Sequence, residues 1–193
     1  MKKSLIATGA AAVALAAMPA FGAFADVTDT VTITINGSCS VGGTTATTGA
    51  GVSLSETMTN GSTKTWDADG TAGGKLVVSC NDSSGWNIKA VGASTGGTNN
   101  VMVPTGSGTP IATGPATSGD TSNWAFKVAG TGAVATYTSF AAVPSTATKV
   151  ATSSDPASAV QINTGYQVYV SATQQADTYT GKVTYTVATG VGS

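Results

Sequence analysis

The feature that most constrains the fold of this chain is the alternation of apolar and hydroxyl side chains in short segments. Tyr179, Val183, Tyr185 and Val187 are separated by small or polar residues, mostly threonine. A period of two residues places successive side chains on opposite faces of a strand, so that one face is buried and the other is solvated. After residue 25, no segment carries apolar residues at helical spacing without interruption by glycine or proline. The chain is therefore expected to be all-β.

Further strands are expected where the same β-rich pattern recurs. These segments are residues 31–35, 75–80, 86–90, 124–128 and 166–170. Because at least six short strands alternate with clusters of Gly, Ser, Asn and Pro, the sequence predicts a single Ig-like antiparallel β-sandwich. Two stretches, Gly92–Ser122 and Ser145–Ser158, are expected to be loop-like, with one short strand at Val101–Val103. Binding in such folds tends to lie on loops.

The N-terminus has the order of regions found in a bacterial signal peptide. Two lysines precede the apolar run Leu5–Ala17, and Ala23 and Ala25 supply small residues at the −3 and −1 positions. We therefore expect cleavage after Ala25, so that residues 1–25 are a signal peptide and residues 26–193 form the β-sandwich domain. The alternative is an uncleaved anchor, because about 20 residues are long enough to span a bilayer. After processing, no stable membrane span is expected.

Cys39 and Cys80 are the two cysteines of the chain. An even number of cysteines in an exported protein predicts a disulfide. The separation of 41 residues corresponds to a stabilisation of about 4 kcal/mol in the chain-entropy model. A redox or thiolate-metal role is the alternative, but the spacing is not C-x-x-C and the chain has no histidine.

The composition excludes several kinds of chemistry. The chain has no histidine and no arginine, and its 8 lysines face 9 acidic residues. Without histidine it cannot form a Ser-His-Asp triad or a His-ligated metal site. Few positive charges leave no electrostatic footprint for nucleic acid. We accordingly expect no cofactor, no metal and no enzymatic activity, with a carbohydrate-active hydrolase based on paired aspartates as a minor alternative.

Two blocks of the sequence resemble the bacterial WxL surface domains. Val78–Ile88 has a strand, an Asp- and Gly-containing turn and a Trp-x-Ile, where that family has Trp-x-Leu. Ala176–Val187 resembles the terminal block of the family, with Tyr185 in place of its second tryptophan. The resemblance implies a secreted all-β domain that is held non-covalently on the cell wall.

A second, looser resemblance is to chaperone–usher pilins and spore coat U-type domains, which share the spacing of the two cysteines. It implies an Ig-like sandwich whose subunits assemble by strand pairing. In that case the alternating residues Val31, Ile33 and Ile35 would pair with the sheet edge of a neighbouring chain.

The leading hypothesis is a non-enzymatic, secreted cell-surface protein, structural or adhesive, that displays loops and binds the cell envelope. Its partner would be a cell-wall polymer or another surface protein. Trp66 and the loop with Pro104 and Pro110 are the candidate contacts. Trp66 lies near a turn, whereas Trp86 and Trp124 have apolar partners and are expected in the core. The alternative is a self-associating, pilin-like fibre subunit.

Overall fold

The computed structural model describes residues 38–42, 56–68, 73–93, 100–115, 119–130 and 134–191. All of them belong to one compact unit, Asn36–Ser193. The predicted signal peptide and the strand expected at residues 31–35 lie outside the described residues. No helix occurs among the residues that are described, and so none there could cross a membrane.

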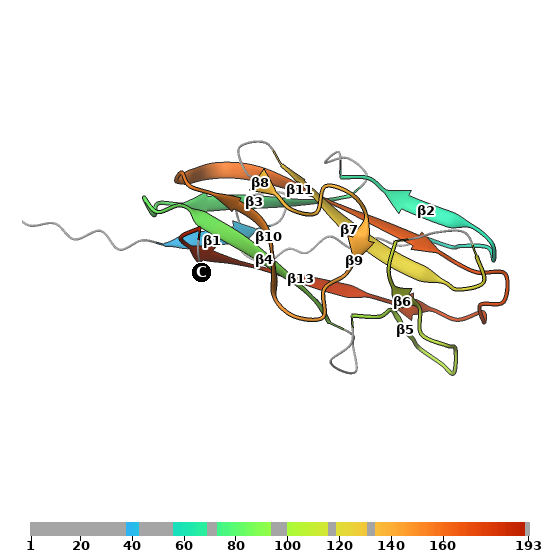
Figure 1. Cartoon of the computed structure of the whole chain (residues 1–193). Helices are drawn as coiled ribbons and strands as arrows, with labels where there is room; N and C mark the ends of the chain where they lie inside the picture. The colour runs from blue at the N-terminus through green and yellow to red at the C-terminus, as the bar shows by residue number, and fades with distance from the viewer. Residues whose placement is uncertain are drawn as a thin grey trace, which may run out of the picture. The chain divides into compact units, whose positions relative to one another are not determined.

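Strands are the only regular secondary structure among the described residues, as the alternation of the sequence predicts (Figure 1). In chain order they are β1 Cys39–Gly42, β2 Thr63–Trp66, β3 Gly74–Cys80, β4 Trp86–Ala93, β5 Val103–Pro104, β6 Ala112–Thr113, β7 Asn123–Gly130, β8 Val134–Ala135, β9 Ala141–Ala142, β10 Thr148–Ser153, β11 Ala157–Tyr169, β12 Tyr179–Thr180 and β13 Lys182–Thr189. The all-β expectation is therefore confirmed for this part of the chain.

The strands form three sheets. A seven-stranded sheet has the order β1-β3-β11-β7-β6, with β2 also beside β11 and β9 beside β7. A four-stranded sheet has the order β13-β4-β10-β8, and β12 pairs with β5. The strand β6 runs parallel to β7, which departs from the expected antiparallel pattern, whereas the other described strand pairs are antiparallel.

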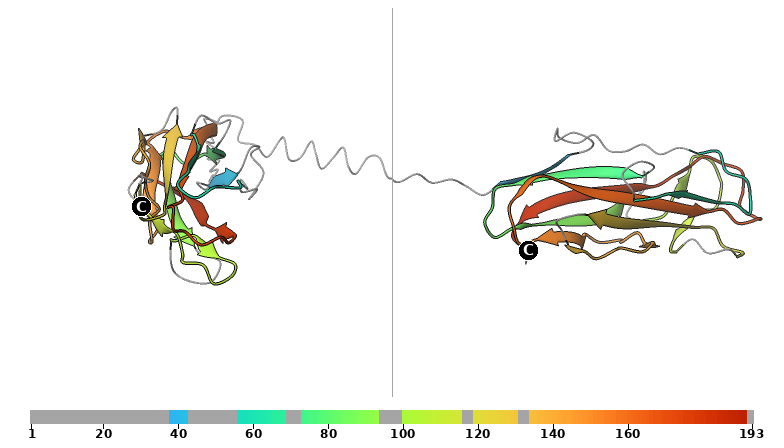
Figure 2. Two further views of the ribbon diagram at one scale, coloured as in Figure 1. Left: turned by 90° about the vertical axis from the view of Figure 1, so that its right-hand side faces the viewer. Right: turned by 90° about the horizontal axis from the view of Figure 1, so that it is seen from above.

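The long strand β11 organises the larger sheet (Figure 2). Along one edge its first half pairs with β3 and its last residues pair with β2, while the other edge pairs with β7. The two ends of β11 therefore lead to different surroundings. Ala157 lies opposite Cys80, near the disulfide, and Tyr169 leads into a group of loops.

One hydrophobic core joins the two larger sheets. Phe126 and Ile162 of the larger sheet and Trp86 and Val150 of the smaller one are fully buried and belong to the same cluster. The phenol oxygens of Tyr166 and Tyr185 lie 3.0 Å apart and so connect β11 with β13. Desolvation raises the pKa of both phenols. The alternating side chains predicted to be buried at residues 86–90 and 124–128 are among those that fill the core.

One expected loop and one expected strand boundary are wrong in part. The stretch Ser145–Ser158 contains β10, in which Val150 and Ala151 are fully buried. Likewise, β11 begins at Ala157, well before the predicted residue 166. These segments consist mostly of small and polar residues, so they lack the large alternating side chains that indicate a strand. Pairing with neighbours on both edges nevertheless makes them strands.

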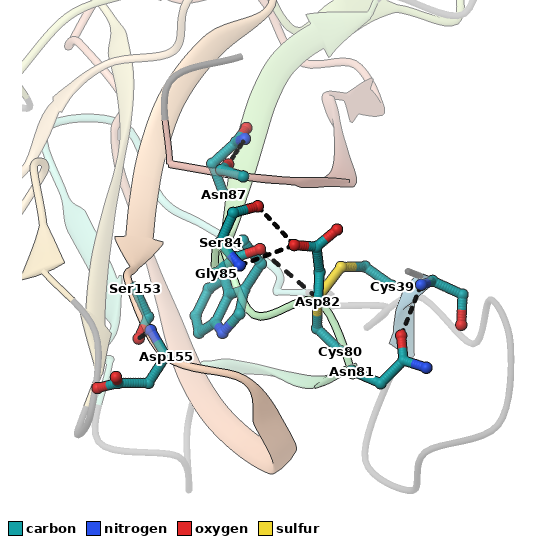
Figure 3. The surroundings of a disulfide bond; sticks show 12 residues. Cys39, Cys80, Asn81, Asp82, Ser84, Gly85, Asn87, Ser153 and Asp155 are labelled. Atoms are coloured by element: carbon teal, nitrogen blue, oxygen red, sulfur yellow. Dashed lines mark hydrogen bonds between the residues drawn. A yellow bond between two sulfur atoms is a disulfide. The ribbon is translucent and has the colours of Figure 1, made fainter. Parts of the chain in front are cut away.

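The predicted disulfide between Cys39 and Cys80 is confirmed (Figure 3). The two cysteines lie directly opposite each other in the β1–β3 pair, with Cα atoms 4.1 Å apart. Next to them, the Ser38 amide donates a 2.6 Å hydrogen bond to Oδ1 of Asn81. The disulfide therefore links β1, the edge strand of the larger sheet, covalently to its neighbour β3.

The chain then reverses into β4 through residues 81–85, which we call the disulfide turn. The Asp82 carboxylate accepts hydrogen bonds from N and Oγ of Ser84, at 2.8 and 2.5 Å. These bonds hold the pKa of Asp82 below its usual range. Gly85 has a φ of +82°, and a Cβ there would collide with the backbone oxygen of Ser153. Glycine is therefore required at this position both by conformation and by space.

Candidate functional site

A polar pocket of about 190 Å³ lies where the chain leaves the C-terminal end of β11. Its walls come from three segments, residues 109–112, 120–122 and 171–175. The first connects β5 to β6, the second precedes β7, and the third follows β11 (Figure 1). We call these segments and the hollow between them the polar pocket.

Asp177 holds the loop that leads into the first wall. Its carboxylate accepts hydrogen bonds from the amides of Gly106, at 3.1 Å, and Gly108, at 3.2 Å. The amide of Thr178 donates a further bond of 2.7 Å. A Cβ on Gly108 would lie 2.5 Å from the Tyr179 hydroxyl, so a larger residue at this position would have to displace that hydroxyl.

The charge of Asp177 is stabilised by this arrangement. Desolvation raises the pKa of the carboxyl group, but hydrogen bonds from four backbone amides outweigh it and hold the pKa below its usual range. A carboxylate that accepts several backbone N–H bonds is favoured in its charged form. The loop is therefore held by a group that is ionised at neutral pH.

Side-chain amides fix the third wall to its surroundings. Nδ2 of Asn60 donates to the carbonyl oxygens of Ala172 and Gln174, at 3.0 and 3.1 Å. Nε2 of Gln174 donates to the Thr109 carbonyl oxygen and to the Tyr179 hydroxyl, both at 2.7 Å. The third wall is thereby joined to the first wall across the pocket.

Two buried serines connect the second wall to the third. The backbone amide of Ser171 donates a 2.9 Å hydrogen bond to Oγ of Ser122. Both residues are almost fully buried, with exposures of 2% and 4%. The Tyr169 hydroxyl also donates to the Gly119 carbonyl oxygen at 2.8 Å. All three walls are thus positioned by hydrogen bonds, although they consist of loops.

The lining offers hydroxyl, amide and carboxylate groups together with the apolar side chains of Pro110 and Ala112. Asp120 is its one charged residue. Within the described ranges, no group of three potential metal ligands occurs. The pocket is therefore equipped to form hydrogen bonds with a small polar ligand.

The predicted contact residues do not gather in one place. Pro110 lines the polar pocket, whereas Pro104 lies in β5 opposite Tyr179, next to the loop held by Asp177. Trp66 lies in β2, half-buried against the core, and the Lys64 ammonium is 5.8 Å from its ring centroid. Trp66 does not line the pocket. The burial predicted for Trp86 and Trp124 is confirmed.

Apart from Pro110, the sequence did not single out the residues that build the pocket. Asp120, Asp177, Gln174 and Asn60 are isolated polar residues among many serines, threonines and glycines. The one local signal is the pair of glycines at 106 and 108, which Asp177 approaches from far along the chain. Val31, Ile33 and Ile35 lie outside the described residues.

Comparison with known proteins gives no relative: no protein-family model, curated protein or solved structure matches this chain. The function is therefore inferred from the geometry of the site and from the sequence.

Proposed function

We propose that this protein is a non-enzymatic, secreted bacterial cell-surface protein that binds an envelope polymer non-covalently. Its domain would be a single Ig-like β-sandwich, residues 26–193, released by cleavage of a signal peptide after Ala25. The observation that carries the proposal is the loop group around the polar pocket. Loops that are held in position before a ligand arrives lose less conformational entropy on binding, and this is what a recognition surface requires.

Three features support the placement outside the cell. The disulfide between Cys39 and Cys80 is of a kind that persists in oxidising compartments. The N-terminal residues have the pattern of a signal peptide. Many exposed positions among the described residues carry hydroxyl side chains, and charged residues make up only 9% of the chain.

The arrangement of the two blocks that resemble WxL domains supports a relationship with that family. The first block forms the end of β3, the disulfide turn and the start of β4, and the second forms β12 and most of β13. The blocks lie side by side, because β13 pairs with β4 and places Val187 opposite Ile88. The residues that occupy the Leu positions of that family are therefore cross-strand partners here.

A non-enzymatic role fits the lining of the pocket. Glycoside hydrolysis usually requires two carboxyl groups on either side of the scissile bond. The lining supplies one carboxyl group, that of Asp120, among hydroxyls and amides. Such a set is suited to holding a polar ligand.

Cosedimentation with purified cell-envelope polymer tests the proposal. We expect the protein to pellet with the polymer and Pro110→Ser to lower the bound fraction by severalfold. Pro156→Ser is the matched control, because Pro156 is also an exposed loop proline but lies near the disulfide. Failure of the wild-type protein to pellet with any envelope fraction would contradict the proposal.

A pilin-like fibre subunit is the second candidate, and the sheet edges favour it. The strands β1 and β13 are terminal in their sheets, and in the described part of the chain no strand pairs with their outer edges. Val31, Ile33 and Ile35 of another chain would then supply the missing strand. Ladders on SDS gels of unboiled protein that disappear in Ile33→Asp would support this candidate, whereas a monomer in size-exclusion chromatography would exclude it.

A further inference from the structure

The polar pocket has hydrogen-bonding capacity that the described residues do not use among themselves. Oγ of Ser122 accepts the Ser171 amide, which leaves its hydroxyl proton free to be donated. Both protons on Nε2 of Gln174 are donated to protein acceptors, which leaves Oε1 free to accept. In the described part of the chain, the Asp120 carboxylate has neither an ion pair nor a hydrogen bond. The lining therefore combines free donors with free acceptors in a small space.

We propose that the polar pocket binds one neutral sugar ring of an envelope polysaccharide. This inference rests on the proposed function and names the chemical unit that the surface recognises. A sugar hydroxyl both donates and accepts, so adjacent hydroxyls can satisfy Asp120 and Ser122 together. Hydrogen bonds from hydroxyls to a carboxylate are charge-assisted and hence stronger than those between neutral groups.

The charge of the lining selects against anionic ligands. Asp120 contributes a negative charge, and none of the described lysines lines the pocket. A phosphate, a uronic acid or a carboxylate would therefore be repelled, because like charges at close range are unfavourable. A neutral hexose or N-acetylhexosamine meets no such repulsion.

The size of the pocket suits a single ring. Its volume of about 190 Å³ is below the range of roughly 300–1,000 Å³ that is typical of pockets for larger ligands. Pro110 and Ala112 form an apolar patch against which the C–H groups of a sugar can pack. None of the described residues that line the pocket is aromatic. We therefore expect weak binding of a free monosaccharide, with a Kd on the order of 1–10 mM.

Titration of the ¹⁵N-labelled protein with individual sugars, followed by NMR, tests this inference. Neutral hexoses and N-acetylglucosamine, added up to about 100 mM to saturate a millimolar site, should shift the amide signals of residues 120–122 and 171–175. Glucuronic acid should bind several times more weakly. Asp120→Asn should weaken binding of the neutral sugar about tenfold. Asp155→Asn removes the same charge from an exposed residue near the disulfide and should change nothing.

The outcomes separate this inference from the proposed function. Shifts that are absent, that lie elsewhere, or that persist unchanged in Asp120→Asn would overturn the sugar site. If the protein still pellets with envelope polymer in that case, the proposed function stands and only the ligand assignment fails. If the protein neither pellets nor binds a sugar, both fail.

Discussion

Near each end of β11 an aspartate accepts hydrogen bonds that hold a turn or loop in place. The two aspartates differ in how far along the chain their hydrogen-bond donors lie. Asp82 accepts hydrogen bonds from Ser84, two residues away, inside the disulfide turn. Asp177 accepts hydrogen bonds from the amide of Gly106, 71 residues away, and so joins two loops beside the polar pocket. The disulfide turn is thus fixed by local contacts and a covalent bond, whereas the pocket depends on contacts between distant segments.

This difference indicates a division of roles. The disulfide turn sits beside strands whose side chains fill the core, so changes there should alter the global stability of the protein. The loops of the polar pocket contribute few buried apolar side chains, so changes there should alter the shape of the pocket more than the free energy of unfolding. Substitutions at the two ends of β11 should therefore have different effects on stability and on the pocket.

Removal of the disulfide should have the largest effect. We expect the double substitution Cys39→Ala and Cys80→Ala to lower the free energy of unfolding by about 4 kcal/mol, because the unfolded chain regains the entropy of an open loop. Urea unfolding of the variant and the wild-type protein measures the difference. An equal loss of stability on reduction of the wild-type protein is the control, and an unchanged midpoint would contradict the prediction.

Replacement of a turn glycine should have the next largest effect, and this effect should be larger in the disulfide turn than at Gly61. Gly85 and Gly61 both have positive φ, at +82° and +76°, but only Gly85 has backbone atoms where a Cβ would lie. Gly61→Ala should cost about 1 kcal/mol for the left-handed conformation alone. Gly85→Ala should cost at least about 2 kcal/mol, since the collision with Ser153 is added. Thermal unfolding of the pair is the measurement, and equal losses would show that space at the disulfide turn does not matter.

A stabilising substitution is expected at the end of β11 that lies near the disulfide. Ala159 has a φ of 56°, at a point in β11 where the register with β3 shifts. Relief of the left-handed conformation by Ala159→Gly outweighs the added entropy of the unfolded chain and should raise stability by about 0.5–1 kcal/mol. Calorimetry should show a rise in Tm of roughly 2 °C. A fall in Tm would indicate that the bulge is not strained.

Protonation of Asp177 should have the smallest effect on global stability and a clear local one. Because its pKa is lowered in the folded protein, its contribution is complete above the unfolded value of 3.8 and is lost as pH falls through the folded pKa. The amide signals of Gly106 and Gly108 should therefore be constant from pH 7 to about 5 and move only in stronger acid.

Asp177→Asn should move those two amide signals at neutral pH while the urea midpoint changes little. Asp155→Asn is the control, since it removes an exposed carboxylate that lies away from the pocket. A large loss of global stability in Asp177→Asn would contradict the division between the two ends.

The sequence predicted the strands whose side chains are large. β3, β4 and β7 were expected within a few residues of their observed bounds, because alternating Val, Ile, Trp and Phe indicate a half-buried strand wherever the chain folds. The strand β10 was missed, since Ala151 and its neighbouring threonines and serines resemble a loop in composition. Their burial depends on pairing with β4 and β8, which no local pattern reveals.

The β-rich fold and the disulfide could be predicted without a structure, because period-two alternation and a single pair of cysteines can be recognised in the sequence. Of the residues that build the polar pocket, only Pro110 was expected from the sequence. No local pattern marks Asp177 as the acceptor of the Gly106 and Gly108 amides, which the fold brings next to it. Likewise, Asn60 can donate to the carbonyl groups of Ala172 and Gln174 only because the fold places these residues beside it. Hydrogen bonds between residues far apart in sequence depend on where the strands end in space, and these positions are set by the packing of the whole domain.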